Sequence, residues 1–313
     1  AGDAITYQYL ALLDYSKILE ARGDVFAAAY YAGIAADLKD HFETEWYSED
    51  DRMYRRGFDA DGNSKTDWGR ESTFLMPYSQ ISDLGPKTEK YLDFITENIY
   101  TFGINIEATT YLSEVFYLHG RKATGWHFLK GLMASMNSYP EVSYLIINNT
   151  IRGLMGVRPD APDNKFYTLS KLSPEVPWIQ AEHIPIGDND LTIRHDGTMK
   201  STVTNNSGAA ITWEAQFYGE YETITIEGVP ATVNTKSEWG KIISYVTTSI
   251  NVGQTIVIEA ADPVNTGHVF LSDIDWITNN NTANTRKDFN TVGNLLFMDG
   301  NKSYEKGLGV LSN

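Results

Sequence analysis

The sequence predicts a multidomain protein of the α-then-β class, in which the helices form part of an (α/α) toroid and antiparallel strands follow. From residue 3 to about 156, apolar residues recur at helical spacing, whereas from about 165 onward they alternate in short runs broken by turns. The segment VRPDAPDN at 157–164 contains two prolines and three Asp or Asn residues, which is typical of a linker. Helices first and strands afterwards indicate separate domains rather than one mixed sheet.

The helical half is predicted to be a set of hairpins in two rings. The spacing predicts helices over 3–21, 24–46, 70–82, 86–100, 105–119, 122–137 and 141–156. The second, fourth and sixth are amphipathic, whereas the first, fifth and seventh are apolar on nearly every face. A helix that is apolar on every face is expected to be buried on every face. An inner ring inside an outer ring satisfies both patterns, and the alternation of long and short loops supports it.

The second half is predicted to be an antiparallel β-domain. Alternating apolar and polar residues predict strands at 191–197, 211–218, 223–229 and 255–261. We therefore expect one domain over 1–157, a β-sandwich over 158–264 and the beginning of a third domain over 265–313.

Composition excludes several classes of function. The 25 basic and 41 acidic side chains give the 313-residue chain a net charge of −16, which disfavours nucleic acid as a partner. The chain has no cysteine, which excludes thiol catalysis and disulfides, and its six histidines show no paired ligand spacing. We expect no metal and no cofactor. No apolar run approaches the roughly 20 residues of a membrane span. The first residues, AGDAITYQYL, show no signal peptide and read as a helix entry inside a domain, as in a fragment.

Carboxylates mark the beginnings of the predicted inner helices. Asp3, Glu71, Glu107 and Glu141 all fall at or beside these N-termini. An acid in the first turn is also favoured by the helix dipole alone, so a capping role stays open for each. Several carboxylates on one rim are, however, what glycoside hydrolysis requires: one protonated acid and one base or nucleophile across the sugar ring.

The insertion between the second and third helices carries a second group of polar residues. DADGNSKTD at 59–67 places oxygen-bearing side chains at alternate positions as a calcium loop does, but Ser64 replaces the required glycine and Arg70 the bidentate glutamate. A short hairpin turning at Asp61-Gly62 is favoured instead. This hairpin would bring to the rim three candidate sugar-binding residues, although a structural role for the tryptophan is equally open: Asp67, Trp68 and Arg70.

The stretch YPEVSYLIINNTIRGLMGVRPDAPD at 139–163 resembles the C-terminal part of the six-hairpin glycosidases. Its end, GLMGVRPDAPD, followed by a β-sandwich, resembles the end of α-L-rhamnosidase-like enzymes, without the rhamnosidase motifs themselves. The resemblance implies an (α/α)6 barrel with Glu141 as catalytic base. It places the general acid upstream of Ala1, or at Glu71 if the hairpins are counted differently. The missing N-terminal half of the barrel would be a covalent or associated partner. Tyr139 and Asp3 are further candidates for substrate binding.

The tail resembles a second family. LSDIDW at 271–276, the central GN-L and YEKGLGV at 304–310 are similar to the beginning of NPCBM carbohydrate-binding modules. The resemblance implies the first part of a galactose-binding-like β-sandwich. The chain departs from the pattern at Leu311, where family members continue with histidine.

Together these observations predict part of a bacterial glycoside hydrolase, secreted or at the cell surface, that cleaves oligo- or polysaccharides by inverting hydrolysis. Two alternatives remain. A polysaccharide lyase also uses helical toroids, but needs a Tyr, His or Lys base and basic neutralisers, whereas the rim here offers mainly acids. A noncatalytic glycan-binding or scaffold protein could share the fold.

Overall fold

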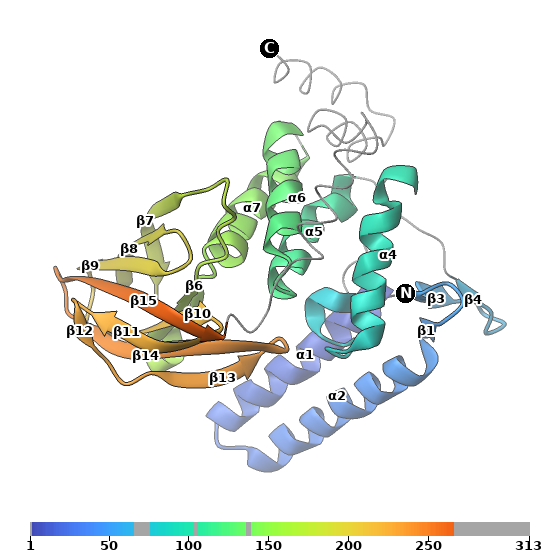
Figure 1. The fold of residues 1–313 in the computed structure, drawn as a ribbon. Coiled ribbons are helices and arrows are strands. Elements are labelled where there is room, and N and C mark those ends of the chain that lie inside the picture. Colours follow the sequence, from blue (N-terminus) through green and yellow to red (C-terminus); the bar gives the residue numbers. More distant parts are fainter. Residues whose placement is uncertain (1, 66–75, 103–105, 136–138, 266–313) are drawn as a thin grey trace. The chain divides into compact units, whose positions relative to one another are not determined.

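The computed structural model describes residues 2–65, 76–102, 106–135 and 139–265 (Figure 1). Most of the helix predicted over 70–82 and the tail predicted over 265–313 lie outside these residues. The described part forms two compact units, one mainly helical, the other made of the β-sheets together with Phe116–Lys130 and the end of the last helix.

The predicted helices other than the one over 70–82 are confirmed with closely similar ends. They are α1 (Gly2–Ala21), α2 (Val25–Glu45), α4 (Pro86–Phe102), α5 (Ile106–Leu118), α6 (Lys122–Ser135) and α7 (Pro140–Asn148). Local chemistry accounts for several starts: the Asp24 side chain accepts a hydrogen bond from the Ala27 amide, and Pro86 and Pro140 occupy first helical positions. The helix predicted over 141–156 changes type partway, because α7 continues as a π-helix over Asn149–Leu154. Within the described residues, no helix is long and apolar enough to cross a membrane.

Burial follows the predicted rings for α5 but not for every helix. Side chains on all sides of α5 are buried or partly buried, as expected for an inner helix. In contrast, α1 exposes Tyr7 and Ile18, and α7 exposes Ile147, so these two helices are not covered on every face by the described residues. On α6, one stripe at helical spacing is partly or fully exposed, and nearly all other residues of the helix are buried, as expected for an amphipathic helix: Lys122, Trp126, Lys130 and Met133.

The segment after α2 folds back on the helical unit as two small hairpins. Strand β1 (Tyr47–Ser48) pairs with β2 (Met53–Tyr54), and β3 (Gly57–Phe58) pairs with β4 (Ser64–Lys65). The buried ring of Tyr54 stacks on Phe42 of α2 at 4.9 Å and meets Tyr91 of α4 edge-on at 5.4 Å. The predicted hairpin is therefore confirmed, and the Asp59 carboxylate accepts backbone hydrogen bonds from Asp61 and Asn63 in its turn.

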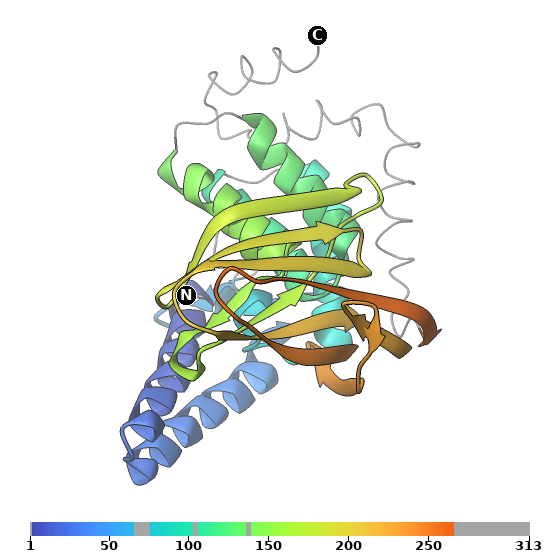
Figure 2. The same ribbon diagram turned by 90° about the vertical axis from the view of Figure 1, so that its left-hand side faces the viewer.

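The β-region contains two large sheets (Figures 1 and 2). One has the order β13-β14-β10-β6-β5 and the other β12-β11-β15-β9-β8-β7. The strands are β5 (Arg158–Asp160), β6 (Lys165–Leu169), β7 (Trp178–Ile186), β8 (Asn189–Asp196), β9 (Lys200–Ser207), β10 (Ile211–Tyr218), β11 (Glu220–Ile226), β12 (Val229–Pro230), β13 (Asn234–Glu238), β14 (Lys241–Ile250) and β15 (Thr255–Asn265). The predicted strands are thus confirmed as β8, β10, β11 and β15.

Alternate residues of the two sheets share one hydrophobic core. Ile193 of β8, Trp213 of β10 and Ile258 of β15 are all fully buried in the same cluster. The period of two along each strand explains this, because alternate side chains point to the same face of a sheet. The core continues into the end of the last helix through Met155.

Two features of the β-region differ from the sequence-based expectation. Residues predicted as a linker instead contain strand β5 and a 3-10 turn over Ala161–Asp163, so the junction is part of the five-stranded sheet. Pairing is antiparallel throughout both large sheets except between β10 and β6, which run parallel. A long crossover makes this parallel pair possible, because the three strands β7, β8 and β9 lie between β6 and β10 along the chain.

Candidate active site

Glu141 occupies the first turn of α7. It is the second residue of the helix, directly after Pro140, and its side chain is partly exposed. A carboxylate at this position is stabilised by the unpaired amides of the first turn. Glu141 therefore has the helix position that the sequence predicted, and its role as a catalytic base stays a prediction.

Glu107 occupies the equivalent position of α5. It is the second residue of that helix and is also partly exposed. Glu107 and Glu141 are thus both acids at the second position of a predicted inner helix.

Contacts around Tyr117 bring the last turns of α5 and of the π-helix that follows α7 together. The Tyr117 ring, at the end of α5, lies against Gly125 at the start of α6 and Gly153 at the end of the π-helix. Since the last turns of α5 and of α7 with its π-helical extension meet at this point, both helices run toward it. Their first turns, with Glu107 and Glu141, are the ends of the two helices that lie away from this contact.

Asp3 lies in the first turn of α1, as the sequence predicted. Its Oδ1 atom is buried and has no hydrogen-bond partner among the described residues, and the same is true of Oγ1 of fully buried Thr6, one turn later. Buried polar atoms are nearly always hydrogen-bonded, so these two oxygens are candidates for contact with a ligand. Sequence reasoning missed Thr6 because a lone threonine in a helix carries no pattern.

Of the remaining predicted site residues, the structure describes one, Tyr139. Tyr139 directly precedes α7 and is partly exposed. Four others lie outside the described residues and stay predictions: Glu71, Asp67, Trp68 and Arg70.

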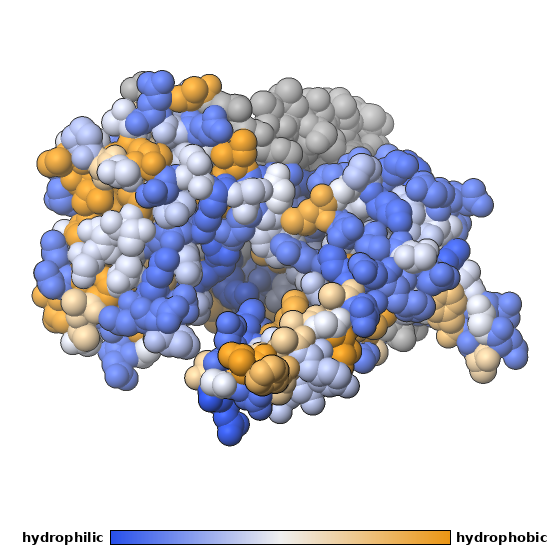
Figure 3. All heavy atoms as spheres, turned by 90° about the horizontal axis from the view of Figure 1, so that it is seen from below, coloured by the Kyte–Doolittle hydropathy of each residue, from blue (hydrophilic) through white to orange (hydrophobic). Residues whose placement is uncertain are grey.

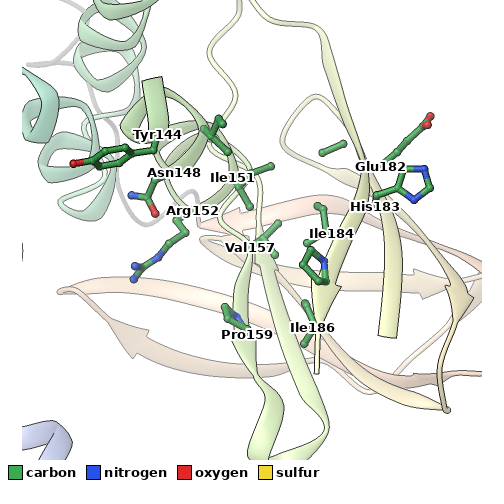
Figure 4. A pocket seen from close by; sticks show the side chains of 13 residues that line it. Tyr144, Asn148, Ile151, Arg152, Val157, Pro159, Glu182, His183, Ile184 and Ile186 are labelled. Atoms are coloured by element: carbon green, nitrogen blue, oxygen red, sulfur yellow. The ribbon is translucent and has the colours of Figure 1, made fainter. Parts of the chain in front are cut away.

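A separate pocket of about 480 Å³ lies between the last helical turns and the six-stranded sheet (Figure 4). One helical stripe forms one wall, with Tyr144, Ile147, Asn148, Ile151 and Arg152, and strand β7 forms the other. Figure 4 shows the side chains of Glu182 and His183 extending away from the helix, so the wall facing it is largely apolar. Glu182 is the one carboxylate of the lining residues. The pocket therefore lacks the carboxylate pair that acid–base hydrolysis of a glycoside needs.

His183 at the edge of this pocket forms an ion pair with Asp190. Its Nδ1 lies 2.9 Å from Oδ2 of Asp190, and this hydrogen bond raises the pKa of the exposed imidazole and lowers that of the carboxyl. The φ angle of His183 is 58°, at a bulge in β7. The pair links β7 to the neighbouring strand β8.

The described residues contain no group of three or more His, Cys, Asp or Glu side chains arranged to hold a metal ion. The candidate site rests on carboxylates at helix starts.

Comparison with solved structures relates the fold to glycoside hydrolases. The chain is similar to the α-L-rhamnosidase from Dictyoglumus thermophilum, with a TM-score of 0.54 and 14% identity, over 82% of this chain and 31% of that one. A weaker similarity, with a TM-score of 0.32 and 12% identity, links it to Ara127N-Se, a GH127 β-L-arabinofuranosidase from Geobacillus Stearothermophilus T6, over 82% of this chain and 42% of that one. No known protein family and no curated protein matches the sequence. The chain thus has a glycosidase-like fold and spans about a third of the length of the rhamnosidase.

Proposed function

We propose that the chain is part of a glycoside hydrolase that cleaves oligo- or polysaccharides outside the cell. Residues 1–157 would be the later part of an (α/α)6 barrel, followed by a β-sandwich and the start of a carbohydrate-binding module. The fold similarity to an enzyme named as a glycosidase supports the class of protein. This similarity of fold carries no information about which sugar is cleaved.

The observation that carries the proposal is the position of Glu141 with Glu107. Both are partly exposed carboxylates in first helical turns, and the last turns of the two helical segments that carry them meet at Tyr117. In inverting hydrolysis a carboxylate takes a proton from water while a carboxylic acid protonates the leaving oxygen, and the two groups lie roughly 6.5–9.5 Å apart. We assign the base to Glu141. The acid would come from Glu71 or from a residue outside this chain.

Mutation of Glu141 tests the proposal. In the complete polypeptide, Glu141→Gln is expected to lower kcat by about 10²–10⁴-fold, because the amide cannot accept the proton from water. Glu89→Gln is the matched control, since Glu89 is also a first-turn acid, but of α4. Its kcat is expected to stay at the wild-type value. Unchanged turnover in Glu141→Gln would remove this residue from the mechanism.

The product distinguishes the alternatives. Hydrolysis with inversion gives the opposite anomer, visible by NMR directly after cleavage. An unsaturated product that absorbs in the ultraviolet would identify a lyase instead. Glycan binding without turnover would identify a noncatalytic binding protein.

A further inference from the structure

The pocket between the end of the last helix and strand β7 has both of its walls in one compact unit. Its helical wall comes from residues 144–152 and its sheet wall from residues 181–186, and both ranges belong to the unit that contains the β-sheets. The volume of about 480 Å³ falls within the roughly 300–1,000 Å³ that are typical of small-molecule sites. Its lining holds a single carboxylate, so glycoside hydrolysis does not account for it.

Each wall contains an irregular stretch of backbone. The helical wall ends in the π-helix Asn149–Leu154. In the sheet wall, β7 has a bulge between Ala181 and Ile184, and His183 within it has a φ angle of 58°, which is uncommon for a residue other than glycine. π-helices, bulges and left-handed residues are each rare, and each occurs preferentially at functional sites. Two such irregularities on opposite walls of one pocket indicate a binding site.

The bulge determines which side chains face the helix. Glu182 and His183 extend away from the helical wall, and Nδ1 of His183 is held by Asp190 at 2.9 Å (Figure 4). Ile184 and Ile186, which follow the bulge and line the pocket, are nearly buried and belong to the hydrophobic core of the sheets. The sheet wall is therefore apolar and continuous with a packed core.

The helical wall adds further apolar surface. Ile151 packs against the same core, and its carbonyl accepts a hydrogen bond from the Val157 amide at 2.9 Å, which fixes these two lining residues relative to each other. Over the β-region, on the left of Figure 3, hydrophobic spheres lie in small groups among hydrophilic ones. Scattered apolar residues of that kind are normal on a protein surface. An apolar pocket is the more specific sign of a ligand.

The polar groups of the helical wall lie along one side of it. Tyr144, Asn148 and Arg152 follow one another at intervals of four residues, and in Figure 4 their side chains extend away from β7. The Arg152 guanidinium has five N–H donors, so it can bind a carboxylate in addition to the groups that it already contacts. A ligand with an apolar body and an anionic end would match both parts of the lining.

The structure of β7 argues against an extended peptide as the occupant. This strand lies at the edge of the six-stranded sheet, where a peptide could add as a further strand. However, the bulge between Ala181 and Ile184 interrupts regular pairing, and Pro185 has no N–H to donate. A sugar is also disfavoured, because its hydroxyl groups would lose water against apolar walls without gaining hydrogen bonds. A compact and largely apolar molecule fits the pocket better than either.

We propose that this pocket binds a small amphiphilic carboxylate, with its apolar body between Ile151 and Ile184 and its carboxylate at Arg152. The body would displace water from the apolar walls, and the guanidinium would hold the charged end at the rim. The inference goes beyond the proposed function, because this ligand is neither a sugar nor cleaved.

Two probes that differ only in charge test the proposal: 2-naphthoate and its neutral analogue 2-naphthamide. By equilibrium dialysis we expect 2-naphthoate to bind the 313-residue chain with a Kd below about 1 mM, and more tightly than 2-naphthamide. Arg152→Gln should weaken the binding of 2-naphthoate about tenfold and leave that of 2-naphthamide unchanged, because it removes only the cation. With 2-naphthoate bound, hydrogen exchange should slow in residues 144–152 and 181–186.

A matched pair of apolar substitutions locates the bound probe. Ile147, which lines the pocket, and Val229 of β12, which does not, are both 65% exposed, so neither substitution should disturb folding. Ile147→Gln is expected to weaken both probes several-fold, and Val229→Gln to weaken neither. Equal effects of these two substitutions would place binding elsewhere and overturn the proposal. Absence of binding at millimolar concentration would also overturn it.

The charged end of the ligand has its own contradicting outcome. If Arg152→Gln weakened 2-naphthoate and 2-naphthamide equally, the carboxylate would not be recognised and the ligand class would be wrong. Far-UV circular dichroism should be the same for all variants. None of these measurements uses turnover, so failure of the glycosidase assignment would leave the result intact.

Discussion

The Tyr117 ring, at the end of α5, packs against α6 and against the π-helix. It is fully buried, and a Cβ added at Gly153 would lie 2.7 Å from its ring, whereas one at Gly125 would lie 2.9 Å away. Gly153→Ala is therefore expected to lower the free energy of unfolding by about 1–3 kcal/mol, because the enclosed ring cannot move aside. Urea denaturation measures this.

Gly33→Ala is the matched control for that substitution. The added methyl group meets nothing within 4 Å, and alanine favours the helix, so a gain of about 0.5–1 kcal/mol is expected. Equal effects of the two substitutions would contradict the packing argument.

His195 makes the stability of the β-region depend on pH. The buried ring donates from Nε2 to the Met155 carbonyl at 3.0 Å and accepts at Nδ1 from the Ser201 hydroxyl at 2.8 Å. Burial lowers its pKa to about 4. Since the unfolded imidazole has a pKa of about 6.5, this contribution is complete above pH 6.5 and is lost as the pH falls toward 4.

His195→Gln should therefore flatten the fall of the urea midpoint between pH 6.5 and 4. The slope that remains would include a contribution from His127, because burial also lowers the pKa of its side chain to about 4. A variant with the slope of the wild type would show that His195 does not titrate with unfolding.

Single residues also show how far sequence reasoning reaches. Acids in the first turns of α1, α5 and α7 could be predicted because capping and dipole effects are local. The contact between the last turn of α5 and the π-helix could not, because it depends on the packing of Tyr117 against Gly153, which lies far along the chain. The buried oxygen of Thr6 gave no signal at all.

At the level of elements, Glu214 connects three strands of the five-stranded sheet. Its carboxylate, on β10, accepts hydrogen bonds from Lys165 of β6 at 2.6 Å and Lys236 of β13 at 2.8 Å. Burial raises its pKa, but the hydrogen bonds from Lys165, Lys236 and Gln216 outweigh this and lower it overall. The stabilisation by Glu214 is thus complete above the pKa that its carboxyl has in the unfolded chain. It is lost as the pH falls through the lower pKa of this carboxyl in the folded protein.

Glu214→Gln is expected to cost roughly 1–3 kcal/mol at neutral pH, because Lys165 loses its carboxylate partner and Lys236 keeps only Glu238, at 3.2 Å. Asp14→Asn removes the exposed pair with Lys17 and is the control, with an expected change below about 0.5 kcal/mol. Thermal or urea denaturation compares them. A cost no greater than that of the control would show that the network contributes little.

Helices and strands could be predicted where the spacing of apolar residues was distinct. They were missed where two kinds of structure have the same spacing. The π-helix at Asn149–Leu154 continues the apolar spacing of α7, so its i→i+5 pattern leaves no separate signature. Strand β5 was read as a linker because Pro159 and Asp160 favour turns, yet proline is tolerated on this edge strand of the sheet. The parallel pairing of β6 with β10 is non-local and was invisible to alternation alone.

For the whole molecule, the α-then-β order was predicted from the change of period and is confirmed. The toroid was inferred from the apolar character of α1, α5 and α7 on nearly every face and from the alternating loop lengths. The residues of α5 are buried or partly buried, whereas exposed apolar side chains on α1 and α7 show that burial depends on neighbours as well as on composition. A sequence can thus indicate that a face needs a partner without showing which segment provides it.

The two compact units predict two unfolding transitions. Substituting Asp24→Ala removes the cap of α2, at a cost of about 1 kcal/mol, and should lower the urea midpoint of exchange protection in α1 and α2. Gly153→Ala should instead lower the midpoint in β10 and β14, whose core reaches the end of the π-helix at Met155. Hydrogen exchange followed by mass spectrometry resolves both regions in one experiment. Equal shifts of both regions in each variant would mean that the chain unfolds as one cooperative unit.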